Sequence, residues 1–286
     1  MLRAAITKMA NSSTRRNKAE IQYAEKLKLE RKFRQRVSKT LNDLSKDIAA
    51  AYAEAGETFN AELYYPEFER ILFEHYVYVA DRFGSSLTDD LTVDEAAIGA
   101  VAIIAATRGT SSAAVVEAFK RDKDAGIIRF IKQTVPVRAA EITRTNIKAA
   151  NSAVAAAQAG MAGANQLAVG KAAGRSFKAS NIYRASTIAA TETQTAAEGT
   201  KLVEAELFGE AISESPISNA VVKKEWQTMG DDLVRPEHAA ANGQVQLVDD
   251  PYVVGGEEMM TSGDDSLGAS AGNVINCRCA SITFVE

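Results

Sequence analysis

The feature that most constrains the fold is a long run near the N-terminus that contains neither proline nor glycine. Between Lys18 and Ala55, apolar residues recur at spacings of three, four and eight positions. These residues are Ile21, Leu29, Phe33, Val37, Leu41, Leu44 and Ile48. The spacing places them on one face of an α-helix and leaves charged residues on the other. A helix of this length predicts an elongated arm rather than a compact core helix.

Helical patterns continue through much of the chain. Pro66 is placed to open a second helix, which Gly84 ends. Further helices are predicted over residues 92–106, from the break at residues 109–112 to about residue 120, and over 137–159, whereas residues 127–134 are ambiguous. The glycine-rich stretch 160–174 indicates either a flexible joint or a close crossing of two helices.

The pattern changes after Leu207. Short apolar runs now alternate with turn-forming pairs, Asn242-Gly243 and Gly255-Gly256. Such alternation is typical of a small β-rich module. We therefore predict an α+β protein. Residues 1–175 form a mainly helical, partly elongated region, and residues 181–286 form a compact module with a helix packed on a small antiparallel sheet.

Charge and hydropathy exclude several classes of protein. The formal net charge of −4 argues against a dedicated nucleic-acid binder. No segment approaches the roughly 18 uninterrupted apolar residues of a membrane span, and no signal peptide is apparent. With two cysteines one residue apart, a disulfide framework is not expected, which fits synthesis in a reducing cytoplasm.

The cysteines, Cys277 and Cys279, offer a candidate metal site together with His238. In a strand, their side chains would point to the same face. Asp231 or Asp232 could complete the four ligands that structural zinc prefers. However, the Cys-x-Cys spacing is shorter than the usual one, and the chain has no second pair. The favoured alternative has no metal: the thiols pack beneath a strand and the histidine hydrogen-bonds locally. A disulfide between the two would close a small, strained ring.

The same residues admit two further interpretations. A cysteine, His238 and Asp231 could form a nucleophilic trio, but only the residue types support it, and we expect no enzyme activity. Arg235, His238 and Asp232 could form either a set of charge pairs that pins a loop or a buried polar network. The sequence leaves these two possibilities open.

A basic stretch lies within the predicted N-terminal helix. It comprises Arg15, Arg16, Lys18, Lys26, Lys28, Arg31, Lys32, Arg34, Arg36 and Lys39. These residues could contact DNA phosphates without sequence preference, or a partner protein. Because Glu20, Glu25 and Glu30 interrupt the stretch, a solvated helix face is the alternative.

The C-terminal third resembles the Mu F-like minor head proteins of tailed phages, the phage head morphogenesis family. Five pieces of residues 183–286 carry the resemblance, in the family's order. They are the helix Arg184–Glu192, then Trp226 with Asp231-Asp232, Arg235 and His238, then Gly243-Gln244, Gly255-Gly256, and Asn276-Cys277-Arg278-Cys279. One departure is that the family's Pro-Gly-Asp turn here reads Thr261-Ser262-Gly263-Asp264-Asp265.

The resemblance implies a structural, minor capsid protein of a phage or prophage. It would be assembled in the host cytoplasm and reside in the virion, inside the head near the portal. The implied partners are the portal protein, other capsid or scaffold proteins and packaged DNA, with a role in head assembly and genome delivery. The resemblance also implies that residues 1–175 dock on the portal or capsid, with the basic stretch as a contact for the portal or DNA. No membrane partner is expected, and no cofactor apart from the zinc alternative. The competing hypotheses are a metal- or thiol-dependent enzyme module carried by a helical delivery segment and a non-specific DNA-binding head protein.

Overall fold

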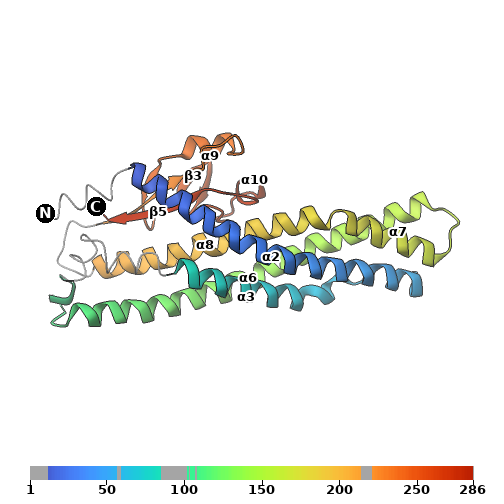
Figure 1. Ribbon diagram of the computed structural model, residues 1–286, viewed down its shortest axis with the longest axis horizontal. Helices are drawn as coiled ribbons and strands as arrows, with labels where there is room; N and C mark the ends of the chain where they lie inside the picture. The colour runs from blue at the N-terminus through green and yellow to red at the C-terminus, as the bar shows by residue number, and fades with distance from the viewer. Residues whose placement is uncertain are drawn as a thin grey trace. The chain divides into compact units, whose positions relative to one another are not determined.

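The computed structural model describes residues 12–56, 59–84, 102, 104–106, 108–213 and 221–285. Its elements are α2 (Ser12–Ala55), η1 (Ala61–Tyr64), α3 (Tyr65–Phe83), α6 (Ser112–Gly160), α7 (Gln166–Ala179), α8 (Asn181–Ser213), β1 (Val222–Gln227), α9 (Pro236–Ala241), β2 (Val245–Leu247), β3 (Tyr252–Val254), β4 (Glu257–Met259), α10 (Ala271–Val274) and β5 (Ala280–Val285) (Figure 1). Helices followed by small antiparallel sheets confirm the α+β class.

The chain divides into two compact units made of non-contiguous segments. The sheet unit comprises residues 1–28, 77–131 and 193–286, and the helical unit comprises residues 29–76 and 132–192. Each unit therefore draws on both of the regions, 1–175 and 181–286, that the sequence distinguished. Long helices such as α2 and α8 contribute segments to both units.

Two predicted helices are confirmed, whereas two others that were predicted as separate are a single helix. The long N-terminal helix is α2, and α3 carries Pro66 in its first turn and ends at Phe83. Most of the helix predicted over 92–106 lies outside the described residues. The separate helices ending near 120 and spanning 137–159 are one helix, α6, which continues through Pro136. A proline inside a helix costs about 3 kcal/mol, but the buried stripe of Ile127, Ile131 and Val135 at spacings of four continues across the ambiguous segment.

The apolar face of α2 is largely as predicted. Leu29, Phe33 and the later members of the face are at most 3% exposed. The first member, Ile21, is an exception at 64%, because the polar residues Gln22 and Lys26 take the inward positions there. In the helical unit, Phe33 stacks on His75, with ring centroids 3.9 Å apart. Burial, with a smaller effect of Arg36, lowers the pKa of His75 to about 3, so it is a neutral packing residue.

The glycine-rich stretch forms a close helix crossing. Residues 161–163 turn the chain, and α7 then packs on α2 within the helical unit. A Cβ atom added to Gly170 would lie 2.6 Å from the carbonyl oxygen of Ala49, and one added to Gly174 would lie 2.7 Å from that of Ser45. Only glycine allows the backbones to approach so closely, which decides between the two interpretations of this stretch.

A buried ion pair ties α6 to α8 in the helical unit. The Arg138 guanidinium donates from Nη2 to Glu192 Oε1 at 3.0 Å and from Nε at 3.2 Å. Tyr76 donates its hydroxyl hydrogen to Glu192 Oε2 at 2.8 Å. Because both oxygens of the buried carboxylate are satisfied, the charge is tolerated inside the unit.

The sheet unit contains a three-stranded antiparallel sheet in the order β2-β1-β5 and a separate β3–β4 hairpin. Gly255 and Gly256 join the hairpin strands with φ values of +60° and +83°. Two consecutive positive φ angles favour the twist of a tight hairpin and explain the glycine pair. Trp226 of β1 is fully buried and meets Tyr252 of β3 and His238 of α9 edge-on, at centroid distances of 5.3 and 5.5 Å.

Candidate functional site

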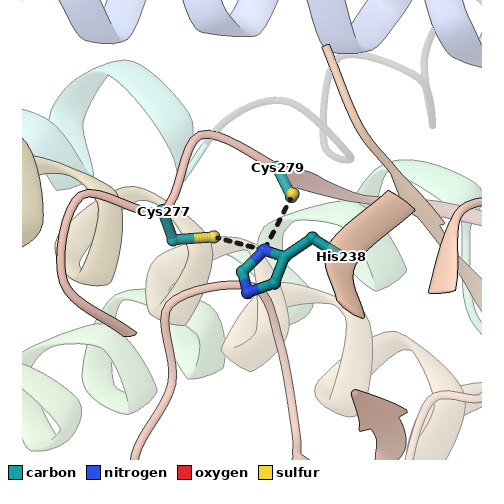
Figure 2. A group of neighbouring side chains, drawn as sticks. All are labelled: His238, Cys277 and Cys279. Atoms are coloured by element: carbon teal, nitrogen blue, oxygen red, sulfur yellow. Dashed lines mark hydrogen bonds between the residues drawn. The ribbon is translucent and has the colours of Figure 1, made fainter. Parts of the chain in front are cut away.

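Three donor side chains of the sheet unit converge in its interior. His238 comes from α9, and Cys277 and Cys279 come from the segment between α10 and β5. His238 Nδ1 lies 3.4 Å from Cys279 Sγ and 3.8 Å from Cys277 Sγ, as Figure 2 shows. One donor atom from each residue lies within 4.8 Å of the others, and the side chains are only 2–3% exposed. We call these three residues the thiol–imidazole cluster.

The local backbone differs from the strand that the sequence suggested. β5 begins at Ala280, so the cysteines precede it, and Asn276 turns the chain with a φ of +56°. The alternation nevertheless holds, because Arg278 points away from the cluster and donates from Nη1 to Asp231 Oδ2 at 2.7 Å. Both cysteines are free thiols.

The predicted partners of His238 are placed elsewhere. Asp231 and Asp232 are exposed, and Asp231 is engaged by Arg278, so neither joins the cluster among the described residues. Arg235 donates to the carbonyl oxygen of Ile275. Arg235, His238 and Asp232 therefore do not form one buried network. The contacts of Arg235 and Asp231 instead hold the loop that carries the cysteines.

Asn273 orients the imidazole, and sequence reasoning missed it. Its Nδ2 donates to the carbonyl oxygen of Val254 at 3.2 Å and to Glu257 at 2.6 Å. These acceptors fix the amide so that Oδ1 faces His238 Nε2, at 3.3 Å. Nε2 must then carry a proton, and Nδ1 is the ring nitrogen that faces the sulfurs. The hydrogen bonds from Ser270 and Asn273 also lower the pKa of Glu257, which keeps this acceptor ionised.

The two thiols are electrostatically inequivalent. The hydrogen bond from Cys279 is the main cause that lowers the pKa of Cys277 well below its ordinary value, and it outweighs burial. The same hydrogen bond, together with burial, raises the pKa of Cys279. Cys277 is therefore the first of the two to become a thiolate.

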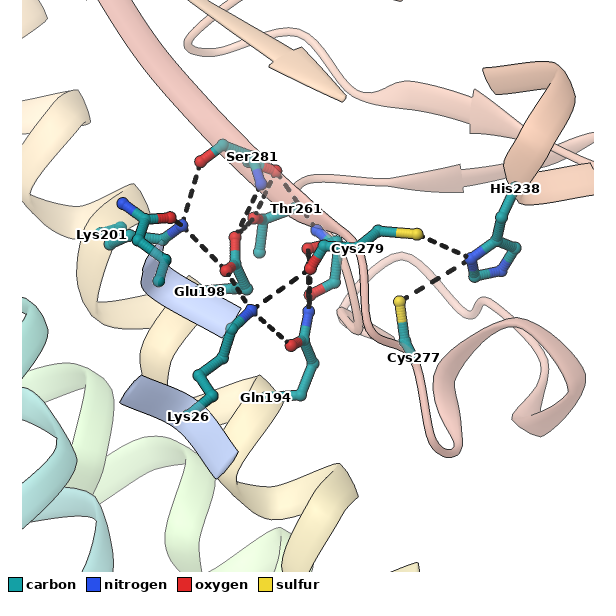
Figure 3. Close-up of polar contacts among 11 residues, drawn as sticks. Lys26, Gln194, Glu198, Lys201, His238, Thr261, Cys277, Cys279 and Ser281 are labelled. Atoms are coloured by element: carbon teal, nitrogen blue, oxygen red, sulfur yellow. Dashed lines mark hydrogen bonds and ion pairs between the residues drawn. The ribbon is translucent and has the colours of Figure 1, made fainter. Parts of the chain in front are cut away.

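A second buried group of the sheet unit holds the backbone of Cys279. Its carbonyl oxygen accepts hydrogen bonds from Gln194 Nε2 at 2.8 Å, from Ser262 Oγ at 3.0 Å and from Lys26 Nζ at 3.3 Å. In Figure 3 this carbonyl faces the polar group, while the side chain of Cys279 faces His238. Helices α2 and α8 thus position one member of the thiol–imidazole cluster through its main chain.

Glu198 is the centre of this polar group. Its Oε1 lies 2.9 Å from Lys26 Nζ and 2.8 Å from Lys201 Nζ, and its Oε2 accepts from the Ser281 N–H at 2.9 Å. We call Lys26, Gln194, Glu198, Lys201 and Ser281 the buried polar network (Figure 3). The signal in the sequence is that Gln194, Glu198 and Lys201 recur at positions i, i+4 and i+7, which lie on one helix face.

The basic residues of α2 separate into structural and exposed ones. Lys26 is 4% exposed, so it does not contact phosphate in the folded chain. Arg15 pairs with Glu225 at 2.6 Å and lies 4.2 Å above the ring of Phe284. Arg16, Lys28 and Arg36 pair with glutamates, and Lys18 is half-buried. The exposed remainder are Arg31, Lys32, Arg34 and Lys39.

The thiol–imidazole cluster has two chemical capabilities. Two sulfurs and one imidazole nitrogen form a donor set for a soft or borderline metal ion. The order thiol, imidazole, amide also matches the arrangement of thiol nucleophiles with an orienting asparagine. Nucleophilic catalysis requires a substrate to reach the sulfur, and at 3% exposure neither Cys277 nor Cys279 is accessible.

Comparison with known families agrees with this arrangement. Residues 153–282 match the family described as phage Mu protein F like protein. This part of the chain is thus phage Mu F-like, confirming the resemblance inferred from the motifs, and the match begins upstream of them. No curated protein and no solved structure matches the chain. Among the described residues, no helix is long and apolar enough to cross a bilayer.

Proposed function

We propose that the chain is a structural minor head protein of a tailed phage or prophage, which acts at the portal vertex during head assembly. The observation that carries this proposal is the family match over residues 153–282. A head protein of this kind resides in the virion and contacts the portal and other capsid or scaffold proteins. A part in genome delivery belongs to the same proposal.

The architecture of the sheet unit supports a structural rather than a catalytic role. The motif residues Trp226, His238, Cys277 and Cys279 are all at most 3% exposed. They contact one another and the strands around them instead of facing an open cleft. Residues placed in this way define a fixed shape, which is what an assembly component must present to its partners.

The direct test removes the chain from the phage or prophage that encodes it. We expect the deletion to lower the yield of infectious particles and to leave defective heads, and a plasmid copy to restore both. The tagged chain should be found in purified heads in low copy number, at a single vertex in electron micrographs. Normal heads without the chain, or purified virions that lack it, would refute the proposal.

DNA contact is a second candidate because basic residues are exposed on α2, and four of them lie within residues 31–39. They are Arg31, Lys32, Arg34 and Lys39. If they contact phosphates, binding to duplex DNA of unrelated sequences should weaken steeply as salt increases. Neutralising the four with glutamine should reduce the salt slope by about one for each phosphate that is no longer neutralised. An unchanged slope would assign these residues to a solvated helix face.

A further inference from the structure

We infer that His238, Cys277 and Cys279 bind one metal ion of the zinc class, which clamps α9 to the segment that leads into β5. This inference concerns the sheet unit alone and does not depend on a role in head assembly. It replaces the interpretation that the sequence favoured, in which the thiols pack beneath a strand without a metal.

The N···S spacing of the donor atoms matches a metal site. Zinc lies about 2.3 Å from thiolate sulfur and about 2.0–2.1 Å from imidazole nitrogen, so a tetrahedral site has N···S edges of about 3.6 Å and an S···S edge of about 3.8 Å. The two N···S distances are 3.4 and 3.8 Å. All three donor atoms lie within 4.8 Å of one another, so a small rotation of a cysteine side chain would bring them to one ion.

The donor types select the ion. Thiolate and imidazole favour zinc and related transition metals, whereas magnesium and calcium require oxygen ligands. The three ligands found among the described residues leave a fourth tetrahedral position, which a water molecule would fill. The sulfurs are buried, so the ion would act as a structural clamp rather than at an open catalytic face.

The surroundings prepare the ligands before an ion arrives. Asn273 holds the His238 tautomer in which Nδ1 is free to coordinate, the support that metal-binding histidines usually have. The carbonyl of Cys279 is fixed by three hydrogen bonds from α2, α8 and Ser262. On the other side, Asp231 holds Arg278, between the two cysteines. Such constraints on both faces of a short segment exceed what thiols packed in a core require.

The experiment uses the full chain, purified under reducing conditions without a histidine tag. We expect elemental analysis to find about one zinc ion per chain. After chelation, the melting temperature should fall by roughly 5–10 °C, and zinc but not magnesium should restore it. Cobalt added to the metal-free chain should produce thiolate-to-cobalt charge-transfer absorption.

Substitutions locate the ion. Cys279→Ser and His238→Gln should abolish the cobalt absorption, and Asn273→Ala should weaken zinc binding by about 10–100-fold. Asp232→Asn is the matched control, because it removes an exposed carboxylate of the same loop that is not part of the cluster and should leave the metal content unchanged. Since a variant could fail to fold, the zinc titration of the unmodified chain is the primary measurement.

Two results would overturn the inference. One is a reduced chain that retains no zinc after incubation with excess metal and melts at the same temperature with and without it. The thiols would then form only a hydrogen-bonded group. The other is rapid alkylation of a single cysteine in the zinc-treated, folded chain, which would indicate an accessible nucleophile instead of a metal ligand.

Discussion

The isosteric substitution Glu198→Gln tests the main physical claim about the sheet unit. Glu198 is fully buried and lies within 2.9 Å of two ammonium groups, those of Lys26 and Lys201. Burial alone would raise the pKa of Glu198, but Lys201 and Lys26 outweigh it and lower the value. The carboxylate is therefore ionised at neutral pH and is the counter-charge that the two ammonium groups share inside the unit.

The stability that Glu198→Gln is expected to lose follows from the two lysine charges that remain buried. Glutamine keeps the volume and one acceptor oxygen, but it leaves Lys26 and Lys201, which are 4% and 6% exposed, without a counter-charge. Removing one partner of a buried ion pair typically costs about 3–5 kcal/mol. For a unit of this size, each kcal/mol lowers the melting temperature by about 2–4 °C, so a fall of roughly 6–20 °C is expected.

Thermal unfolding followed by circular dichroism at pH 7 measures this loss. Glu67→Gln is the matched control, because Glu67 forms an exposed pair with Arg70 and its loss should not change the melting temperature measurably. Adding Lys26→Met to Glu198→Gln should recover part of the loss by removing one unpaired cation. If Glu198→Gln has the same melting temperature as Glu67→Gln, the buried charges are not coupled as described.

The same pair of proteins gives a pH test with a defined sign. The folded-state pKa of Glu198 is lowered, so its contribution is present above the ordinary value of 4.5 and is lost as the pH falls through the folded-state pKa. The unmodified chain should therefore lose stability on acidification more steeply than Glu198→Gln. Parallel stability curves below pH 5 would contradict this assignment.

Three further predictions concern other buried positions. Burial lowers the pKa of Lys201 to about 8, so between about pH 8 and 10.5 the unfolded chain binds more protons than the folded one. The free energy of unfolding should therefore rise with pH across this range. Lys201→Met should reduce the rise, as measured by urea unfolding at several pH values. Arg138→Met should cost about 3–5 kcal/mol in urea unfolding, because it leaves Glu192 charged and buried, whereas combining it with Glu192→Gln should cost less. Gly174→Ala should cost about 1–3 kcal/mol by forcing α7 away from α2, whereas Gly160→Ala, which meets no neighbouring atom, should be neutral or stabilising in the same assay.

Local physics explains which parts of the fold the sequence could predict. The spacing of Phe33 to Ile48 depends only on helix geometry, so it identified α2 and its buried face. The Gly255-Gly256 pair marked its hairpin because the turn requires positive φ angles at both positions. The prediction of separate helices on either side of the ambiguous segment 127–134 was wrong, because packing of the flanking turns keeps α6 continuous through Pro136.

Of the candidate site, the sequence could predict only the residues of types that are rare in this chain, the cysteines and a histidine. Cys277, Cys279 and His238 attracted attention because thiols and imidazoles are scarce in this chain, and they do converge. Asn273 escaped notice because its role depends on which of its amide atoms face Val254 and His238. Such an orientation depends on contacts between segments far apart in the sequence and leaves no periodic signal.

Lys26 illustrates the same limit and explains what the buried polar network contributes. In the sequence Lys26 is one residue of a basic stretch. In the structure it contacts the carbonyl oxygen of Cys279, 253 positions away in the sequence, and Glu198, 172 positions away. Buried charges of this kind seldom add stability beyond what apolar residues of equal size would provide. They are satisfied, however, only when α2, α8 and the start of β5 meet in one register, and any slip leaves a charge unpaired. We therefore infer that the network contributes positional precision, and the group it positions most directly is the Cys279 thiol beside His238.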